Sequence, residues 1–201
     1  MKPLFLLIPI AALASTSHAA IVTSGLRDIV ITATFTGVYL DLDGGGGGLV
    51  AEEATGWDIN PFFGGEGIAN SPSFHPVAAT LVLDAPVLNL TLGQTVNGAS
   101  VFASTYPGGY SSSATHIGTN PGQFISGSEG YIGFNFTPNG GGGPLYGWMR
   151  VELSNTGSTG LIREWAYENS GAAITVGAVP EPSAALSLLA GMAAFCYRRR
   201  R

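Results

Sequence analysis

The chain is poor in cysteine and in positive charge, and both shortages exclude classes of protein. Its 201 residues contain one cysteine, Cys196, which lies in a C-terminal apolar run. The chain before that run therefore has no intrachain disulfide, no thiolate metal site and no cysteine nucleophile. Lys2 is the only lysine, and residues 20–180 hold three arginines against twelve carboxylates, a net charge of −9. Because such a surface repels phosphate backbones, we expect no nucleic-acid partner.

Charged residues of either sign are also scarce, at 10% of the chain against about a quarter in ordinary soluble domains. Instead there are 30 glycines and 12 prolines, which favour strands and turns over helices. With 45% hydrophobic residues, the chain is long enough and apolar enough for one folded domain.

Seven short runs alternate apolar and polar residues between segments rich in Gly, Pro, Asn and Ser. The runs cover residues 28–35, 37–43, 78–83, 100–104, 130–137, 145–153 and 161–167. The fifth and sixth are predicted to pair as an antiparallel hairpin with the seventh beside them, burying Ile132, Phe134 and Phe136 against Met149, Val151 and Leu153. A second sheet must cover that apolar face. The sequence therefore predicts a single all-β domain of β-sandwich or jelly-roll type over residues 20–176.

The first nineteen residues have the order of a secretory signal peptide. Lys2 is followed by the apolar run 4–13 and then by small residues, among them Ser17 and Ala19. We predict that signal peptidase cuts between Ala19 and Ala20. The protein is therefore expected to be exported.

The C-terminal segment 177–201 has three parts with separate physical roles. Pro180-Glu181-Pro182 is an extended segment, because proline fixes φ and removes a backbone donor. The uncharged run 183–197 is expected to form a transmembrane helix. The chain then ends in four arginines, expected to stay in the cytoplasm and leave the domain outside: Arg198, Arg199, Arg200 and Arg201. A permanent tail anchor in the inner membrane would have the same features.

These three parts resemble the PEP-CTERM sorting domain of exopolysaccharide-producing Gram-negative bacteria. The resemblance implies recognition by exosortase, a membrane-embedded cysteine protease, followed by removal of the helix. It also implies transfer of the protein from the inner membrane to the cell surface or extracellular matrix. Residues 130–136, 146–148 and 165–168 look like the C-terminal half of many uncharacterised proteins with this tail, which implies no activity.

Asp41 and Asp43 are candidate calcium ligands in the exported domain. They have the start of a calcium loop and lie on one side of an extended segment, with Glu52 and Glu53 not far along the chain. The later ligands of an EF-hand are missing. A solvated strand end that runs into a glycine turn would explain the same residues without metal.

Four aromatic residues are a candidate sugar-stacking platform. Tyr146 and Trp148 lie on the strand face opposite Met149, and Trp165 and Tyr167 are expected to line up beside them. Packing of these rings under a loop or against the other sheet is the alternative.

No residue pattern points to a catalytic site or a cofactor. His75 and His116 lack metal-ligand spacing, and the chain has no nucleophile elbow. We therefore expect a non-catalytic surface or matrix protein that contacts exopolysaccharide. A carbohydrate-active or other hydrolase on a β-sandwich is the alternative, and carboxylates that face each other in a cleft would favour it.

Overall fold

The computed structural model describes residues 20–44, 48–52, 54–82, 84–104, 111–154 and 156–180. These residues form mainly antiparallel β-structure and contain no α-helix, which confirms the predicted β-rich class. One short 3-10 turn, η2 (Phe63–Gly65), is present. Within these ranges no helix is long and apolar enough to cross a bilayer. The predicted signal peptide 1–19 and the tail from Glu181 onward lie outside the described residues.

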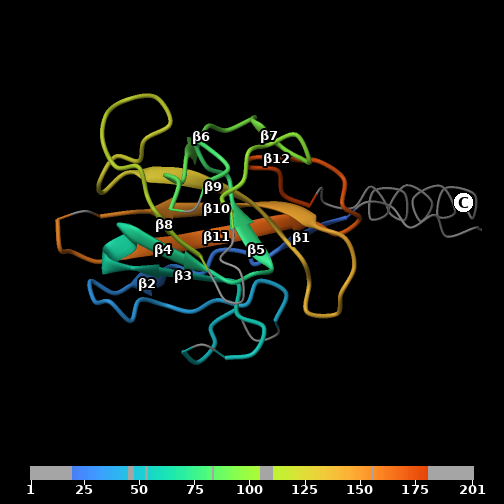
Figure 1. Ribbon diagram of the computed structural model, residues 1–201, viewed down its shortest axis with the longest axis horizontal. Helices are drawn as coiled ribbons and strands as arrows, with labels where there is room; N and C mark the ends of the chain where they lie inside the picture. Colours follow the sequence, from blue (N-terminus) through green and yellow to red (C-terminus); the bar gives the residue numbers. More distant parts are fainter. Residues whose placement is uncertain are drawn as a thin grey trace, which may run out of the picture.

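The described strands belong to three sheets (Figure 1). The large sheet has the order β1-β11-β10-β9-β5, with β2 also paired to β11 and β6 also paired to β9. Its strands are β1 (Ile21–Thr23), β2 (Ile29–Ile31), β5 (Phe74–Pro76), β6 (Asn89–Leu90), β9 (Glu129–Phe136), β10 (Leu145–Glu152) and β11 (Gly160–Glu168). The two smaller sheets contain β3 (Ile59–Phe62), β4 (Gly67–Asn70) and β8 (Ser111–Ala114), and β7 (Thr95–Val96) and β12 (Ile174–Thr175).

The three long strands at the centre of the large sheet match the predicted hairpin and its neighbour. β9 and β10 are antiparallel, with Ile132 opposite Met149 and Phe134 opposite Gly147. Since alternate residues of a strand face the same side, the apolar residues of both strands meet in one buried cluster. A Cβ at Gly147 would overlap the Phe134 ring, so only glycine allows this approach.

Each edge of this centre is covered by two short strands placed end to end. β1 pairs with the end of β11 near Glu168, and β2 pairs with its beginning near Gly160. β5 and β6 divide the outer edge of β9 in the same way. These short strands satisfy backbone groups that an open edge would expose to other chains.

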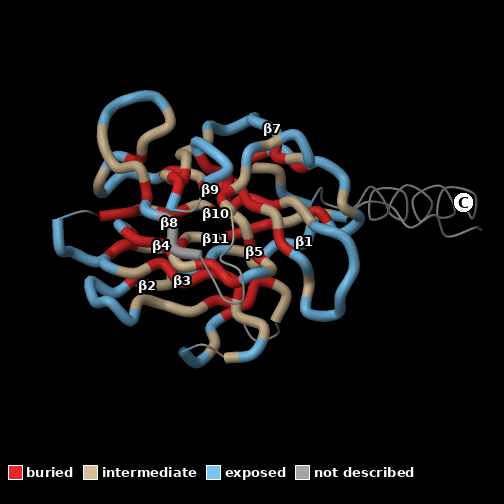
Figure 2. Tube along the Cα trace, in the orientation of Figure 1, coloured by how far each residue is buried: buried red, intermediate tan, exposed pale blue. Residues whose placement is uncertain are grey.

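The face of the large sheet that carries Met149 is covered by the β3–β4–β8 sheet and by the segment around Leu40. Figure 2 shows the buried residues running between these layers. The main core contains Ile31, Leu40, Leu42, Ile59, Ile68, Phe74, Val87, Phe124, Ile132, Phe134, Phe136, Met149, Val151, Leu153, Ile162 and Trp165. The predicted burial of the six hairpin residues is confirmed.

The opposite face of the large sheet is apolar as well. Trp148 and Ala166 on that face pack against the β7–β12 sheet and its flanking residues, in a second core with Val77, Val96, Ile174 and Val176. The large sheet is therefore covered on both faces over part of its length. The strand pattern predicted one buried face and left packing of Tyr146 and Trp148 as an alternative, and the second core shows that both faces are covered.

Three of the seven predicted strands are wrong. Run 37–43 makes only bridges at Leu40, while Ala78 and Phe102 make single bridges in runs 78–83 and 100–104. In run 78–83 the chain turns back directly after Ala79, whose N–H donates to the Pro86 carbonyl at 2.9 Å, so no longer ladder forms. Asp84, with φ of 55°, lies in that turn.

The β3–β4–β8 sheet was not predicted, because Asn, Gly, Pro and Ser are poor strand formers. The buried asparagine side chains of this sheet make hydrogen bonds to backbone groups, which replace the hydrogen bonds they would make to water. Asn60 Nδ2 donates to the Thr36 carbonyl at 3.0 Å, and Asn60 Oδ1 accepts from the Val38 N–H at 2.8 Å. Asn70 Nδ2 donates to the Phe74 carbonyl at 2.7 Å. These bonds offset the cost of burying the two amides.

Both ends of the described domain leave from the same end of the large sheet (Figure 1). The Ala20 N–H donates to Asn169 Oδ1 at 3.0 Å, directly after β11. At the other terminus, Trp148 Nε1 donates to the Ala178 carbonyl at 3.1 Å. Trp148 lies two residues from Tyr146, which is paired with Glu168.

Candidate functional site

Three aspartates gather where the chain around Leu40 runs beside the start of β3. The Asp58 N–H donates to the Leu40 carbonyl at 2.7 Å, which brings Asp58 beside Asp41 and Asp43. One carboxylate oxygen from each aspartate lies within 4.8 Å of the other two. We name these residues the aspartate cluster. Glu52 is not part of the cluster, and Glu53 lies outside the described residues.

Backbone and amide N–H groups hold the cluster together. Asp58 Oδ2 accepts from the Leu42 N–H at 2.7 Å, and Asp41 Oδ1 accepts from the Gly44 N–H at 2.7 Å. Asn139, in the glycine-rich connection between β9 and β10, joins the other two: its Nδ2 donates to Asp41 Oδ2 at 3.0 Å and to Asp43 Oδ1 at 3.2 Å. Its N–H donates to Asp43 Oδ2 at 3.0 Å. Donors from two segments, the loop 42–44 and the β9–β10 connection, therefore partly offset the negative charge.

Burial makes the cluster resist full ionisation. Asp58 is 2% exposed, and burial raises its pKa to about 7, although the bond from Leu42 opposes part of the shift. Burial also raises the pKa of Asp41, and the neighbouring Asp43 adds to that effect. The pKa of Tyr167 is raised by its burial and then by the negative charges of the three aspartates. Burial therefore favours the protonated forms of Asp58 and Asp41, whereas a bound cation would favour the ionised forms.

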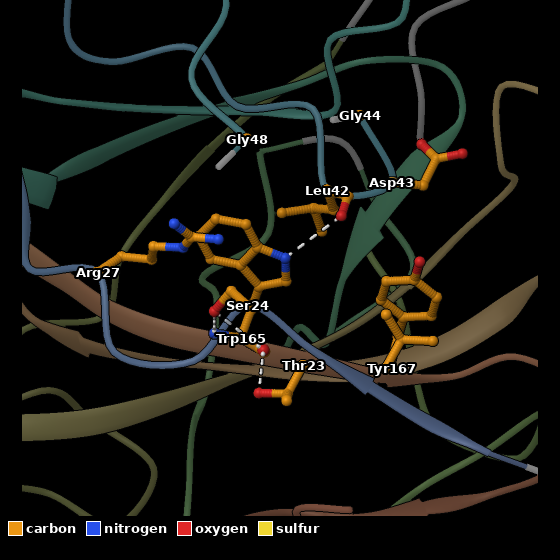
Figure 3. Close-up of a pocket in the computed structure, with 10 residues that line it drawn as sticks. Thr23, Ser24, Arg27, Leu42, Asp43, Gly44, Gly48, Trp165 and Tyr167 are labelled. Carbon is orange, nitrogen blue, oxygen red and sulfur yellow. Dashed lines mark hydrogen bonds between the residues drawn. The ribbon is translucent and has the colours of Figure 1, made fainter. Parts of the chain in front are cut away.

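A pocket of about 190 Å³ opens beside the cluster (Figure 3). Asp43 and Tyr167 lie on one side of it, while Arg27 and Trp165 lie on another. Trp165 Nε1 donates to the Leu42 carbonyl at 3.4 Å. Asp43 is the only carboxylate among the residues that line the pocket, because Asp41 and Asp58 are turned into the protein. Among the described residues, the pocket therefore presents one carboxylate.

The cluster has the chemistry of a hard-cation site, since carboxylate oxygens are the ligands that calcium prefers. The sequence identified Asp41 and Asp43 from their alternate spacing, and the structure brings these two together. Asp58 and Asn139 were missed. A single acid between Trp57 and Ile59, in an otherwise apolar stretch, was the available signal for Asp58.

Of the two interpretations of the aromatic residues, the structure favours packing over a sugar-stacking platform. Trp148 is 1% exposed and Trp165 is 3% exposed, and they lie in different cores on opposite faces of the large sheet. Tyr167 packs with Trp165 against the main core, while Tyr146 packs against the second core with Phe102. The Phe102 and Tyr146 rings stack at 6.2 Å between centroids. Packing on both faces of the sheet, which a single strand does not reveal, buries the two tryptophans and half-buries the two tyrosines.

An ion-pair network covers the part of the second face that β7 and β12 leave open. Arg150 pairs with Glu164 at 2.9 Å and with Glu129 at 3.2 Å, and Arg163 bridges to neighbouring acids. Arg163 pairs with Asp28 at 2.8 Å and with Glu152 at 2.9 Å. Both arginines thus pair with carboxylates of the large sheet and of the residue before β2, which gives the network a structural role.

The histidines and the predicted processing residues complete the comparison with the sequence. His75 Nδ1 lies 3.0 Å from the Ala103 carbonyl oxygen, and neither His75 nor His116 belongs to the aspartate cluster. Ala20 and Pro180 are exposed at the two ends of the domain. The remaining processing residues lie outside the described residues: Ala19, Glu181, Pro182 and Arg198, Arg199, Arg200 and Arg201.

Comparisons with protein-family models, with curated proteins and with solved structures found no match.

Proposed function

We propose that this chain is an exported, non-catalytic surface or extracellular-matrix protein whose PEP-CTERM-like tail is processed by exosortase. The observation that carries the proposal is the exit of both chain ends from one end of the large sheet (Figure 1). A signal peptide before Ala20 and a membrane helix after Pro180 would enter the same inner membrane from the same side. This domain can hold both segments in one membrane while it stays folded.

The way the chain leaves the fold also suits processing. The Val176 N–H donates to the Gln94 carbonyl at 2.8 Å and the Ala178 N–H donates to the Thr175 carbonyl at 2.9 Å, so the chain is fixed up to Ala178. Val179 is 51% exposed and Pro180 is exposed. The Pro-Glu-Pro motif therefore begins outside the ladder, where a protease can bind an extended chain.

The domain itself is proposed to be a β-sandwich of the large sheet and the β3–β4–β8 sheet, extended on its outer face by β7 and β12. A display role fits this pocket better than glycoside hydrolysis does, because Asp43 is the one carboxylate among its described lining residues and most glycoside hydrolases use two. Exopolysaccharide is the proposed partner after release, and signal peptidase and exosortase are the proposed processing enzymes. No cofactor is required for this role.

The proposal is tested by expressing the full chain in hosts with and without exosortase. We expect loss of the C-terminal helix and release from the inner membrane only in the first host, because an intact helix with four arginines holds the chain in lipid. Glu181→Ala should block release, whereas Glu66→Ala, at an exposed site in the domain, should not. Mass spectrometry and N-terminal sequencing of the released protein give both ends, with Ala20 expected first.

Two results would contradict the proposal. A surface form that still ends in Arg198 to Arg201 in the host with exosortase makes the tail a permanent anchor. An envelope form that still begins at Met1 removes the export step.

A further inference from the structure

Three phenylalanine side chains form an exposed group next to η2. The ring centroids of Phe35 and Phe62 are 5.6 Å apart, those of Phe35 and Phe63 are 5.8 Å apart, and those of Phe62 and Phe63 are 5.4 Å apart. Phe35 is 75% exposed and Phe63 is 43% exposed, while Phe62 is half-buried beneath them. We name Phe35, Phe62 and Phe63 the distal aromatic patch. Its rings contact one another and leave much of their surface in water, so they are grouped at one surface site where a ligand could contact all three.

The backbone under the patch is strained. Phe63 has φ of 49°, in the left-handed region that glycine and asparagine normally occupy. The chain is held in this conformation by the Phe63 N–H, which donates to the Thr34 carbonyl at 3.0 Å, and by the Gly64 N–H, which donates to the Thr32 carbonyl at 2.9 Å. A glycine would relieve the strain at this position, so folding alone does not favour a phenylalanine here.

The patch lies at the end of the domain away from both chain termini. It follows β2, whose Ile31 pairs with Gly160 at the start of β11, whereas Ala20 and β1 lie near Glu168 at the other end (Figure 1). The nine residues of β11 separate the two ends by about 26 Å. If the termini face the membrane, the patch points outward.

The hydroxyl groups of Thr32 and Thr34 belong to the segment that precedes Phe35. Thr32 and Thr34 are exposed, and their backbone carbonyls accept the hydrogen bonds from η2. Their Oγ1 atoms lie 2.8 Å apart, and Thr32 Oγ1 also lies 3.3 Å from the Gly37 carbonyl oxygen. Asp28 precedes Thr32 by four residues, Glu66 follows Phe63 by three and is exposed, and residues 20–180 carry a net charge of −9. Exposed rings beside hydroxyls suit the alternating C–H faces and hydroxyls of a sugar, while the negative charge disfavours an anionic polymer.

The size of the patch also favours a small-footprint ligand over a protein. At about 200 Å² for a phenylalanine side chain, Phe35 and Phe63 expose roughly 240 Å² between them. A standard protein interface needs about 800 Å² from each partner. We propose that the distal aromatic patch, with Thr32 and Thr34, is a binding site for a neutral polysaccharide. This inference extends the proposed function, since the outward position of the patch depends on the membrane-facing termini.

The test is affinity gel electrophoresis of the full chain, purified in a detergent without a sugar headgroup. The gels contain dextran or hydroxyethylcellulose as neutral polysaccharides, or alginate as an anionic one. We expect at least one neutral polysaccharide to retard the wild-type chain, and alginate to have no such effect. Phe35→Ala and Phe63→Gly should weaken retardation about tenfold or more, because each removes one ring contact. Ile125→Ala, which removes a 55% exposed apolar side chain outside the patch, should leave it unchanged.

Thermal unfolding separates a binding role from a structural one. Phe63→Gly keeps the positive φ and relieves its strain, so its melting temperature should equal or exceed that of the wild type while retardation is lost. The proposal is overturned if neither neutral polysaccharide retards the wild type, if alginate does so equally, or if the variants bind as the wild type does. Concentration-dependent self-association that Phe35→Ala abolishes, without glycan retardation, would instead assign the patch to a second copy of the chain. Because these measurements do not involve tail processing, their failure leaves the sorting proposal intact.

Discussion

Replacing Asp58 with asparagine should remove most of the pH dependence of stability that the aspartate cluster imposes. Burial raises the Asp58 pKa from 3.8 to about 7 in the folded state, so between these pH values the folded chain holds a proton that the unfolded chain has lost. The stabilising effect is therefore complete below the unfolded pKa and is lost as the pH rises to about 7. At 1.36 kcal/mol per pH unit, a shift of about three units corresponds to roughly 4 kcal/mol.

The assay is thermal unfolding followed by far-ultraviolet circular dichroism from about pH 4 to about pH 8, in a chelator that removes divalent cations. A change of 1 kcal/mol moves the melting temperature of a domain of this size by about 2–4 °C, so the wild type should lose roughly 10 °C over the range. Asp58→Asn should lose much less, because asparagine stays neutral and its Oδ1 can still accept from the Leu42 N–H. The raised pKa of Asp41 leaves a smaller residual slope of the same sign.

Equal slopes for the wild type and Asp58→Asn would refute the reasoning, as would a wild-type melting temperature that does not fall as the pH rises.

The same assay with added calcium tests whether the aspartate cluster binds the ion. If the aspartate cluster binds the ion, calcium at about 100 times its dissociation constant should add about 2.7 kcal/mol near pH 8, when the cluster is ionised. Asp58→Asn should lose that gain, whereas a gain of equal size in both proteins would place the calcium elsewhere.

Other predictions test the sheet, its ion pairs and its C-terminal end. Gly147→Ala should destabilise the domain by about 1–3 kcal/mol in urea unfolding, because the new Cβ would overlap Phe134, whereas Gly140→Ala, whose Cβ meets no atom within 4 Å, should be neutral. Arg163→Gln should lower the melting temperature at low salt, since Asp28 and Glu152 lose their arginine while Glu129 keeps Arg150, and the loss should shrink at high salt as the charges are screened; an equal loss in both salts would contradict the ion-pair role. Trp148→Phe removes the donor to the Ala178 carbonyl, so hydrogen exchange at the Val176 and Ala178 amides should become faster, while unchanged exchange would show that the indole does not hold this segment.

The candidate sites show how far spacing along the chain reaches. Asp41 and Asp43 could be paired from the sequence because they are two residues apart on an extended segment. Asp58 and Asn139 come from other segments and meet them only through the bridge at Leu40 and the path of the β9–β10 connection. The distal aromatic patch could not be predicted from the sequence for the same reason. Phe35 and Phe63 are brought together by backbone hydrogen bonds between η2 and the segment after β2.

The sequence by itself determined the β-rich class and the pairing of β9, β10 and β11, because long runs of alternating residues have one clear apolar face. It also carries the order of charge, apolar run and proline motif at the two ends, on which the export hypothesis depends. Only the tertiary structure decided which outer faces are covered. The alternation within β10 places Trp148 on the face opposite Met149. It is buried there by β7 and β12, which lie more than twenty residues away along the chain on either side. The burial of a side chain depends on which residues pack against its face of the sheet, and these residues can come from any part of the chain, so the local sequence does not reveal it.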